Sequence, residues 1–165
     1  MQRVYIGIGS NMGDREFLIR KAVGALRDLP RTHVIRVSSL YDTDPVGDTE
    51  QPPFLNAVAW VETEITAREL LWQMLLIEKR MGRVRSRRWG PRPIDLDLLF
   101  VDDEIIDEPD LVVPHPEAHR RGFVLLPLHE LDPDFRHPVT GETVRRMMQK
   151  VPPNPPVRKL GRFWY

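Results

Sequence analysis

Two aspartates, Asp95 and Asp97, are spaced so that their carboxylates can act together. They belong to the alternating stretch Ile94-Asp95-Leu96-Asp97-Leu98, which predicts a strand. Alternate side chains of a strand share a face, so the two carboxylates should project together from backbone positions about 7 Å apart. Hard Mg²⁺ prefers such oxygen ligands and adds substrate phosphates to them. A lone Asp-x-Asp is also typical of a solvated strand face, so the surroundings must decide.

Those surroundings favour a metal site. Leu99 and Val101 follow the same alternation and should lie on the carboxylate face, which is therefore not simply wet. Two like charges this close on a half-buried surface require a nearby cation. The sequence therefore predicts Asp95 and Asp97 as Mg²⁺ ligands.

An arginine-rich stretch leads directly into this strand. Its basic residues fall within ten positions around Trp89-Gly90-Pro91, and they are Arg83, Arg85, Arg87, Arg88 and Arg92. Guanidinium groups are forked donors that suit phosphate oxygens. Together with the aspartates they form a charge-complementary set for a metal-bound polyphosphate, which is the usual basis of phosphoryl-transfer catalysis. Two alternatives stay open: a solvated basic loop, and a loop that binds RNA through arginines and one stacking aromatic residue.

A glycine-rich turn near the N-terminus invites a dinucleotide-binding interpretation. The stretch Gly7-Ile8-Gly9-Ser10-Asn11-Met12-Gly13 has the spacing GxGxxxG rather than GxGxxG, and no parallel βαβ series follows it. Glycines on a strand also mark the close approach of another backbone or of a flat ligand. A dinucleotide-dependent oxidoreductase is therefore disfavoured, and the absence of GxxxxGK[ST] excludes a P-loop kinase.

The elements that must position these residues follow the order β-α-β-β-α-β. Strands are predicted over 4–9, 33–41, 55–63 and 94–101. The first helix begins at the N-cap Asp14 and runs to about Leu29, and the second begins at the capping box Thr66-Ala67-Arg68-Glu69 and ends at Gly82. This order is typical of the ferredoxin-like α+β fold, a mostly antiparallel sheet with both helices on one face. The other face stays open for a ligand or for further elements.

The remainder of the chain is less regular. Residues 102–116 are expected to form a hairpin or loop, and residues 117–131 contain a further apolar segment. The proline-rich stretch 151–156 is extended by composition. We therefore expect a single domain over 1–150 and a proline-rich C-terminal tail over 151–165.

Composition excludes several classes of protein. The chain has 165 residues, enough for one domain, and its 24 basic and 24 acidic residues give no net charge, which argues against a dedicated nucleic-acid protein. The lack of cysteine excludes disulfides, thiolate metal sites and cysteine nucleophiles. The segment Met1–Gly9 is too short and too quickly polar for a signal peptide, and no apolar run reaches membrane-spanning length. We expect a soluble, cytoplasmic monomer with neither a nucleic-acid nor a membrane partner.

Six ordered motifs carry a resemblance to a known family. They are Gly9-Ser10-Asn11, Tyr41-Asp42-Thr43 with Pro45, Phe54-Leu55-Asn56, the run from Gly82-Arg83 through Arg88-Trp89-Gly90-Pro91-Arg92 to Asp95-Leu96-Asp97, Pro114-His115, and Arg121-Gly122-Phe123. In this order the chain resembles the 6-hydroxymethyl-7,8-dihydropterin pyrophosphokinases over nearly all of residues 4–150. The resemblance implies an ATP-dependent diphosphotransferase of folate biosynthesis that transfers pyrophosphate from ATP to the pterin and releases AMP.

The resemblance also implies a role for each matched position. The metal ligands would hold two Mg²⁺ ions that bridge the ATP phosphates and the incoming hydroxyl, and they are Asp95 and Asp97. The catalytic arginines, which clamp the phosphates and stabilise charge, would be Arg83 and Arg92. Contacts to ATP would come from Arg88, Trp89, His115 and Arg121. Contacts to the pterin would come from Thr43, Pro45, Phe54, Asn56 and Phe123. Stacking aromatic rings with fixed polar groups at the edge suit a flat heterocycle.

Overall fold

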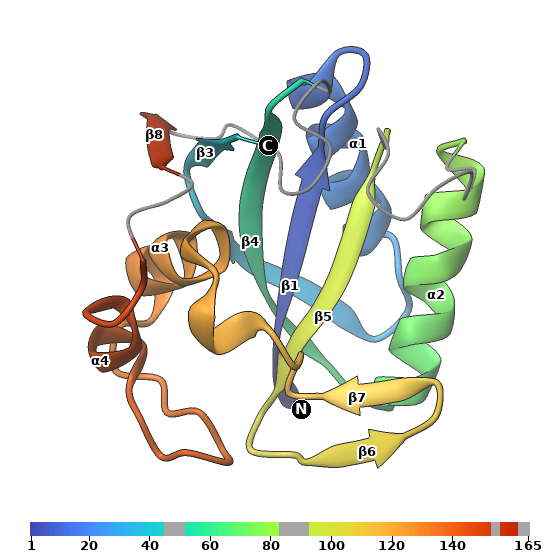
Figure 1. The fold of residues 1–165 in the computed structure, drawn as a ribbon. Helices are drawn as coiled ribbons and strands as arrows, with labels where there is room; N and C mark the ends of the chain where they lie inside the picture. The colour runs from blue at the N-terminus through green and yellow to red at the C-terminus, as the bar shows by residue number, and fades with distance from the viewer. Residues whose placement is uncertain (45–51, 83–92, 153–155, 162–165) are drawn as a thin grey trace.

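An antiparallel sheet forms the centre of the molecule, with helices on both of its faces (Figure 1). The computed structural model describes the chain except for residues 45–51, 83–92, 153–155 and 162–165. The strands of this sheet are β1 (Gln2–Ser10), β2 (Thr32–Val37), β3 (Leu40–Thr43), β4 (Phe54–Thr63), β5 (Asp95–Val101) and β8 (Val157–Gly161). Their order is β5-β1-β4-β3-β8, and β2 pairs with the other end of the β4 edge that β3 uses.

The helices lie in two layers. α1 (Arg15–Arg27) and α2 (Ala67–Arg80) cover one face, whereas α3 (Gly122–Leu131), α4 (Val144–Met148) and the short 3-10 helix η1 (Ala118–Arg120) pack on the other (Figure 1). A separate hairpin joins β6 (Ile106–Glu108) to β7 (Leu111–Val113). The arrangement confirms the predicted ferredoxin-like α+β core with C-terminal additions. Along the described parts of the chain, no helix is both long and apolar enough to cross a membrane.

Two hydrophobic cores hold these layers together, one on each side of the sheet. The alternate β1 residues Val4, Ile6 and Ile8 pack with α1 and α2. Tyr5 points the other way and packs with α3 and α4. The two cores therefore lie on opposite faces of β1, because successive side chains of a strand point to opposite sides.

Both helices of the first layer begin at their predicted caps. The Asp14 carboxylate accepts a hydrogen bond from the Phe17 amide at 3.1 Å, and the Thr66 hydroxyl accepts one from the Glu69 amide at 3.1 Å. Each cap satisfies an amide that has no partner within the first turn of the helix. The first helix ends at Arg27, slightly before the predicted end near Leu29.

The strand predicted over 33–41 is two strands, separated by Ser38 and Ser39. Ser38 exchanges hydrogen bonds with Val58, through its own amide and its hydroxyl, both at 2.9 Å. The Ser39 amide instead donates to the Glu130 carboxylate of α3. The hydrogen bonds of the two serines thus interrupt the regular pairing with β4, and β3 then pairs with the N-terminal end of β4.

A bulge changes which residues of β5 share a face. Tyr5 pairs with Phe100 and Ile6 with Leu98, so Leu99 has no paired residue on β1. Leu99 lies on the carboxylate face as predicted, but the prediction for Val101 was wrong, because Val101 packs in the opposite core. The extra residue shifts the alternation of the strand by one position.

Candidate active site

The sheet face opposite α1 and α2 aligns the predicted carboxylates with the predicted amide. On β1, Gly9 pairs with Asp95 on one side and with Asn56 on the other. Gly7, two residues earlier, pairs with Asp97. Directly paired residues of antiparallel strands project to the same side. At Gly7 and Gly9 the central strand carries no side chain on this face, and this stretch separates the carboxylates of β5 from the amide of β4.

Glycine at position 9 leaves room for the Asn56 side chain, which lies directly over it. A Cβ atom at Gly9 would lie 2.8 Å from Asn56 Oδ1, closer than such atoms approach one another. A Cβ at Gly7 would make only ordinary contacts, at 3.5 Å to Leu99 and 3.6 Å to Asp97. The close approach that strand glycines indicated is thus made here by a side-chain amide.

Three of the predicted pterin-binding residues lie together. Thr43 pairs with Phe54 across β3 and β4, and the Asn56 Nδ2 group donates a long hydrogen bond of 3.4 Å to the Thr43 hydroxyl. Asn56 is only 8% exposed, and Thr43 is buried. With Nδ2 directed to Thr43, the amide oxygen is turned toward Gly9, so the side chain offers a fixed polar edge.

The predicted nucleotide residue His115 lies between charges of opposite sign. Its amide donates to the Leu99 carbonyl at 2.9 Å, which attaches it to β5. Burial, and then the positive charge of Arg121, lower the pKa of His115, whereas the negative charge of Asp95 acts in the opposite direction. Its Nδ1 accepts a hydrogen bond from the Glu117 amide at 3.1 Å. The neutral ring therefore carries its proton on Nε2 and can donate from that atom.

The start of α3 brings two further predicted residues together. Arg121 is the N-cap residue of α3, and Phe123 lies in its first turn. The guanidinium carbon of Arg121 lies 5.4 Å from the centroid of the Phe123 ring, which is cation–π geometry. A predicted ATP residue and a predicted pterin residue thus share one helix end.

Five of the predicted site residues lie outside the described residues. They are Pro45, Arg83, Arg88, Trp89 and Arg92. Their assigned roles stay predictions from the sequence.

A buried carboxylate that the sequence analysis missed anchors the strand of the two aspartates. Glu78 on α2 is 4% exposed, and its Oε2 accepts a hydrogen bond from the Leu96 amide at 2.8 Å. Leu96 lies between the two aspartates on β5, which is an edge strand among the described residues, so that its outward amide needs an acceptor from outside the sheet. The burial of Glu78 could have been predicted from the sequence, because Glu78 lies four residues after Met74 and so occupies the apolar side of the helix.

The donor set on β5 fits a hard divalent cation. Within the described residues, no three histidine, aspartate or glutamate side chains converge on one point. Asp95 and Asp97 nevertheless supply two carboxylates on one strand face beside a glycine floor. Mg²⁺ is commonly bound through one or two carboxylates and completes its shell with water and substrate phosphates.

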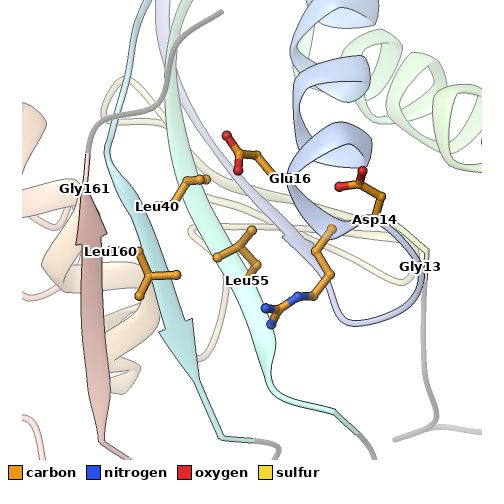
Figure 2. A pocket seen from close by; sticks show the side chains of 8 residues that line it. Gly13, Asp14, Glu16, Leu40, Leu55, Leu160 and Gly161 are labelled. Atoms are coloured by element: carbon orange, nitrogen blue, oxygen red, sulfur yellow. The ribbon is translucent and has the colours of Figure 1, made fainter.

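A pocket of about 410 Å³ lies away from these residues, beside the start of α1 (Figure 2). Figure 2 shows Leu40 of β3, Leu55 of β4 and Leu160 of β8 around it, with Asp14 and Glu16 at the start of α1 opposite. Leu40 and Leu55 belong to the core on the α1 side of the sheet. Among the described lining residues, none belongs to the predicted site, so this pocket is separate from the carboxylate face.

Comparison with known proteins identifies the family. The family model of 7,8-dihydro-6-hydroxymethylpterin-pyrophosphokinase (HPPK) matches residues 5–133. The chain is 44% identical over 154 residues to the 2-amino-4-hydroxy-6-hydroxymethyldihydropteridine pyrophosphokinase of Methylorubrum extorquens, covering 93% of this chain and 96% of that protein. It is 46% identical over 127 residues to the protein of the same name from Bacillus subtilis, covering 77% of this chain and 76% of that one. The chain belongs to the HPPK family.

Solved structures share the fold. HPPK-DHPS of Plasmodium falciparum matches with a TM-score of 0.73 at 17% identity, over 90% of this chain and 44% of that one. The chain therefore spans less than half of that longer protein. The family resemblance inferred from the ordered motifs is confirmed, and it favours phosphotransfer over the RNA-binding and oxidoreductase alternatives.

Proposed function

We propose that this protein transfers the pyrophosphoryl group of ATP to the hydroxymethyl oxygen of 6-hydroxymethyl-7,8-dihydropterin and releases AMP, a step of folate biosynthesis. Family membership gives the reaction class. The observation that carries the assignment to this site is the row of Asp95, Gly9 and Asn56 across three strands. It places a carboxylate suited to a metal-bound polyphosphate beside an amide suited to a heterocycle.

The pterin half of the site would be built on β3, β4 and α3. Asn56 is nearly buried and its amide is oriented by Thr43, which supports a role in reading the hydrogen-bonding edge of the ring. The rings of Phe54 and Phe123 would hold the two faces of the pterin, and Pro45 would complete the edge contacts. A pre-oriented amide discriminates well, because a wrong ligand leaves its buried polar atoms unpaired.

The nucleotide half would be built on β5, His115 and the start of α3. Asp95 and Asp97 would hold two Mg²⁺ ions, which when bound neutralise phosphate charge and orient the phosphates for displacement. The neutral His115 would donate from Nε2 to an acceptor on ATP. The remaining ATP contacts would come from Arg88, Trp89 and Arg121.

The chain's own residues would then align an in-line displacement. A bond forms from the hydroxymethyl oxygen to the β-phosphorus of ATP, and the bond from that phosphorus to the AMP oxygen breaks. AMP leaves with the electron pair, and the hydroxyl proton is released to solvent. Arg83 and Arg92 would stabilise the charge of the transferring group, so positioning and electrostatics carry the catalysis without a covalent nucleophile. We further infer a monomeric, cytoplasmic enzyme.

The direct test is AMP formation from ATP and Mg²⁺, with and without 6-hydroxymethyl-7,8-dihydropterin. We expect AMP that depends on the pterin and is abolished by EDTA. Formation of ADP would instead indicate γ-phosphoryl transfer and contradict the proposed reaction. A folded sample that forms no nucleotide product would contradict the function as a whole.

A further inference from the structure

The C-terminal strand β8 lies outside the matched family region of 5–133, yet it borders the pterin half of the site. It pairs antiparallel with β3, and Val157 stands directly opposite Thr43. Thr43 is the residue that pairs with Phe54 and orients Asn56. The proline-rich tail thus contains a strand that covers the edge of β3 next to the proposed pterin residues.

Val157 also packs against the beginning of α3. A Cβ atom built on Gly122 would lie 3.1 Å from Val157 Cγ2 and 3.4 Å from Val151 Cγ1. Gly122 stands between Arg121 and Phe123. A single tail residue therefore borders both walls of the pterin half, β3 through its backbone and α3 through its side chain.

Polar contacts tie the same two walls together. Glu130 of α3 accepts hydrogen bonds from the Tyr41 hydroxyl at 2.8 Å and from the Ser39 amide at 3.0 Å. Lys159 of β8 lies 3.9 Å from Glu130, and Arg158 donates to Asp42 at 3.0 Å. Ion pairs with such exposed lysine and arginine side chains contribute little. Strand pairing and the apolar contact of Val157 must therefore hold β8 in place.

We propose that β8 is a positioning element of the pterin half of the site, and that Val157 is its positioning residue. It fixes the spacing between β3, whose Thr43 pairs with Phe54, and the start of α3, which carries Phe123, and these two rings are the ones between which the pterin would lie. The inference rests on the proposed function. Its consequence is that Val157 affects the KM for the pterin, whose half it borders on β3 and on α3, more than the KM for ATP, whose half it borders only at the start of α3.

The first test is Val157→Ala in the full chain, with steady-state kinetics for both substrates. Because small misplacements of binding groups weaken a site strongly, we expect the pterin KM to rise about threefold to tenfold, with kcat and the ATP KM within about twofold of wild type. Val157→Thr keeps the branched shape of the side chain, with the hydroxyl in the place of Cγ2, so it should hold the pterin KM closer to wild type than Val157→Ala does. Val139→Ala is the matched control at a residue that is 62% exposed, and it should change none of the constants.

The second test is a double-mutant cycle with Gly122→Ala. The added Cβ would press on Val157 Cγ2, an atom that Val157→Ala removes, so Gly122→Ala should raise the pterin KM less in the Val157→Ala background. Independent effects in the cycle, an unchanged pterin KM in Val157→Ala, or loss of its folding would each overturn the positioning role. A wild-type chain without pterin-dependent AMP formation would refute the proposed function and this inference with it. A fully active Val157→Ala refutes the inference alone.

Discussion

At the scale of single residues, the proposed pterin half depends on Gly9, which has no side chain. Gly9 leaves room for the Asn56 amide, and Thr43 accepts from that amide on its other side. The Asn56 amide is therefore confined between the backbone of β1 at Gly9 and the Thr43 hydroxyl. Affinity for a polar heterocycle depends on such pre-orientation, because the binding step then loses less side-chain entropy.

Gly9→Ala tests this confinement. The new Cβ would stand 2.8 Å from Asn56 Oδ1 and must displace the amide, so we expect the pterin KM to rise about tenfold or more while the ATP KM stays near wild type. Gly7→Ala is the matched control, because its Cβ would make ordinary contacts from 3.5 Å. Equal effects of the two substitutions on the pterin KM would contradict the role of the amide.

Asp97→Asn tests the carboxylate pair. The amide keeps the shape of the side chain but removes the negative charge that a hard cation requires, so we expect kcat to fall about a hundredfold or more. The measurement is AMP formation across a Mg²⁺ titration, with circular dichroism as the check of folding. Asp107→Asn, on the exposed face of β6, should leave the Mg²⁺ dependence unchanged. Near-normal turnover in a folded Asp97→Asn protein would refute the metal assignment.

At the scale of elements, Glu130 joins α3 to the bend between β2 and β3. Its carboxylate accepts from the Ser39 amide, the Ser39 hydroxyl and the Tyr41 hydroxyl. Burial, and then the hydrogen bond to Glu130, raise the pKa of Tyr41, so its hydroxyl remains a donor. The Glu130 carboxylate thus accepts hydrogen bonds from donors of the bend and of β3 that are not bonded to β4.

Glu130→Ala should lower the free energy of unfolding by about 2–3 kcal/mol, because it leaves a backbone amide and two hydroxyls without their acceptor. Tyr41→Phe removes only one of these hydrogen bonds and should cost about 1 kcal/mol. Urea unfolding followed by circular dichroism gives both values. If the two variants lose the same stability, Glu130 does not hold the bend as a unit.

The helices could be predicted from local sequence because their determinants are local. Asp14 and Thr66 cap amides three residues away, a contact that the sequence itself displays. The break at Ser38 and Ser39 depends instead on partners in β4 and α3, and the bulge at Leu99 depends on the pairing with β1. Distant contacts of this kind leave no periodic trace in the sequence, so one strand was predicted where two exist.

In the candidate site, too, some features follow from local sequence and others require contacts between distant parts of the chain. The shared face of the two carboxylates could be predicted from the Asp-x-Asp alternation. The family resemblance names Asn56 as a pterin residue, a role that stays a prediction. The contact between Asn56 and Gly9 requires the register of two strands that are far apart in sequence. Glu78 required the docking of α2 beside the edge of β5.

At the scale of the whole molecule, β1 serves both the core and the site. Its first half sends Tyr5 into the core with α3 and α4, whereas its second half presents Gly7 and Gly9 on the same face. On the other face Val4, Ile6 and Ile8 rest on α1 and α2. β1 thus packs into the second core at one end and lies beneath the candidate site at the other.

The second core also makes the stability of the molecule depend on pH. His137 is buried at the margin of this core, against the edge of the Phe100 ring. Its Nδ1 accepts hydrogen bonds from the Val139 amide at 3.2 Å and the Thr140 amide at 3.4 Å. Burial, and then the nearby His119, lower the pKa of His137. Protonation would turn an acceptor into a donor that faces two other donors.

The sign of the effect follows from proton linkage. Because the folded pKa of His137 lies below its unfolded value of about 6.5, the stabilisation is complete above that pH and is lost as the pH falls through the folded pKa. His137→Asn keeps an acceptor near the place of Nδ1 but does not titrate, so the free energy of unfolding should fall less between pH 7.5 and pH 5 than in wild type. Urea unfolding at a series of pH values measures the slope, and His33→Asn on the exposed side of β2 should leave it unchanged. An identical slope in His137→Asn and wild type would show that protonation of His137 does not limit the acid stability of the fold.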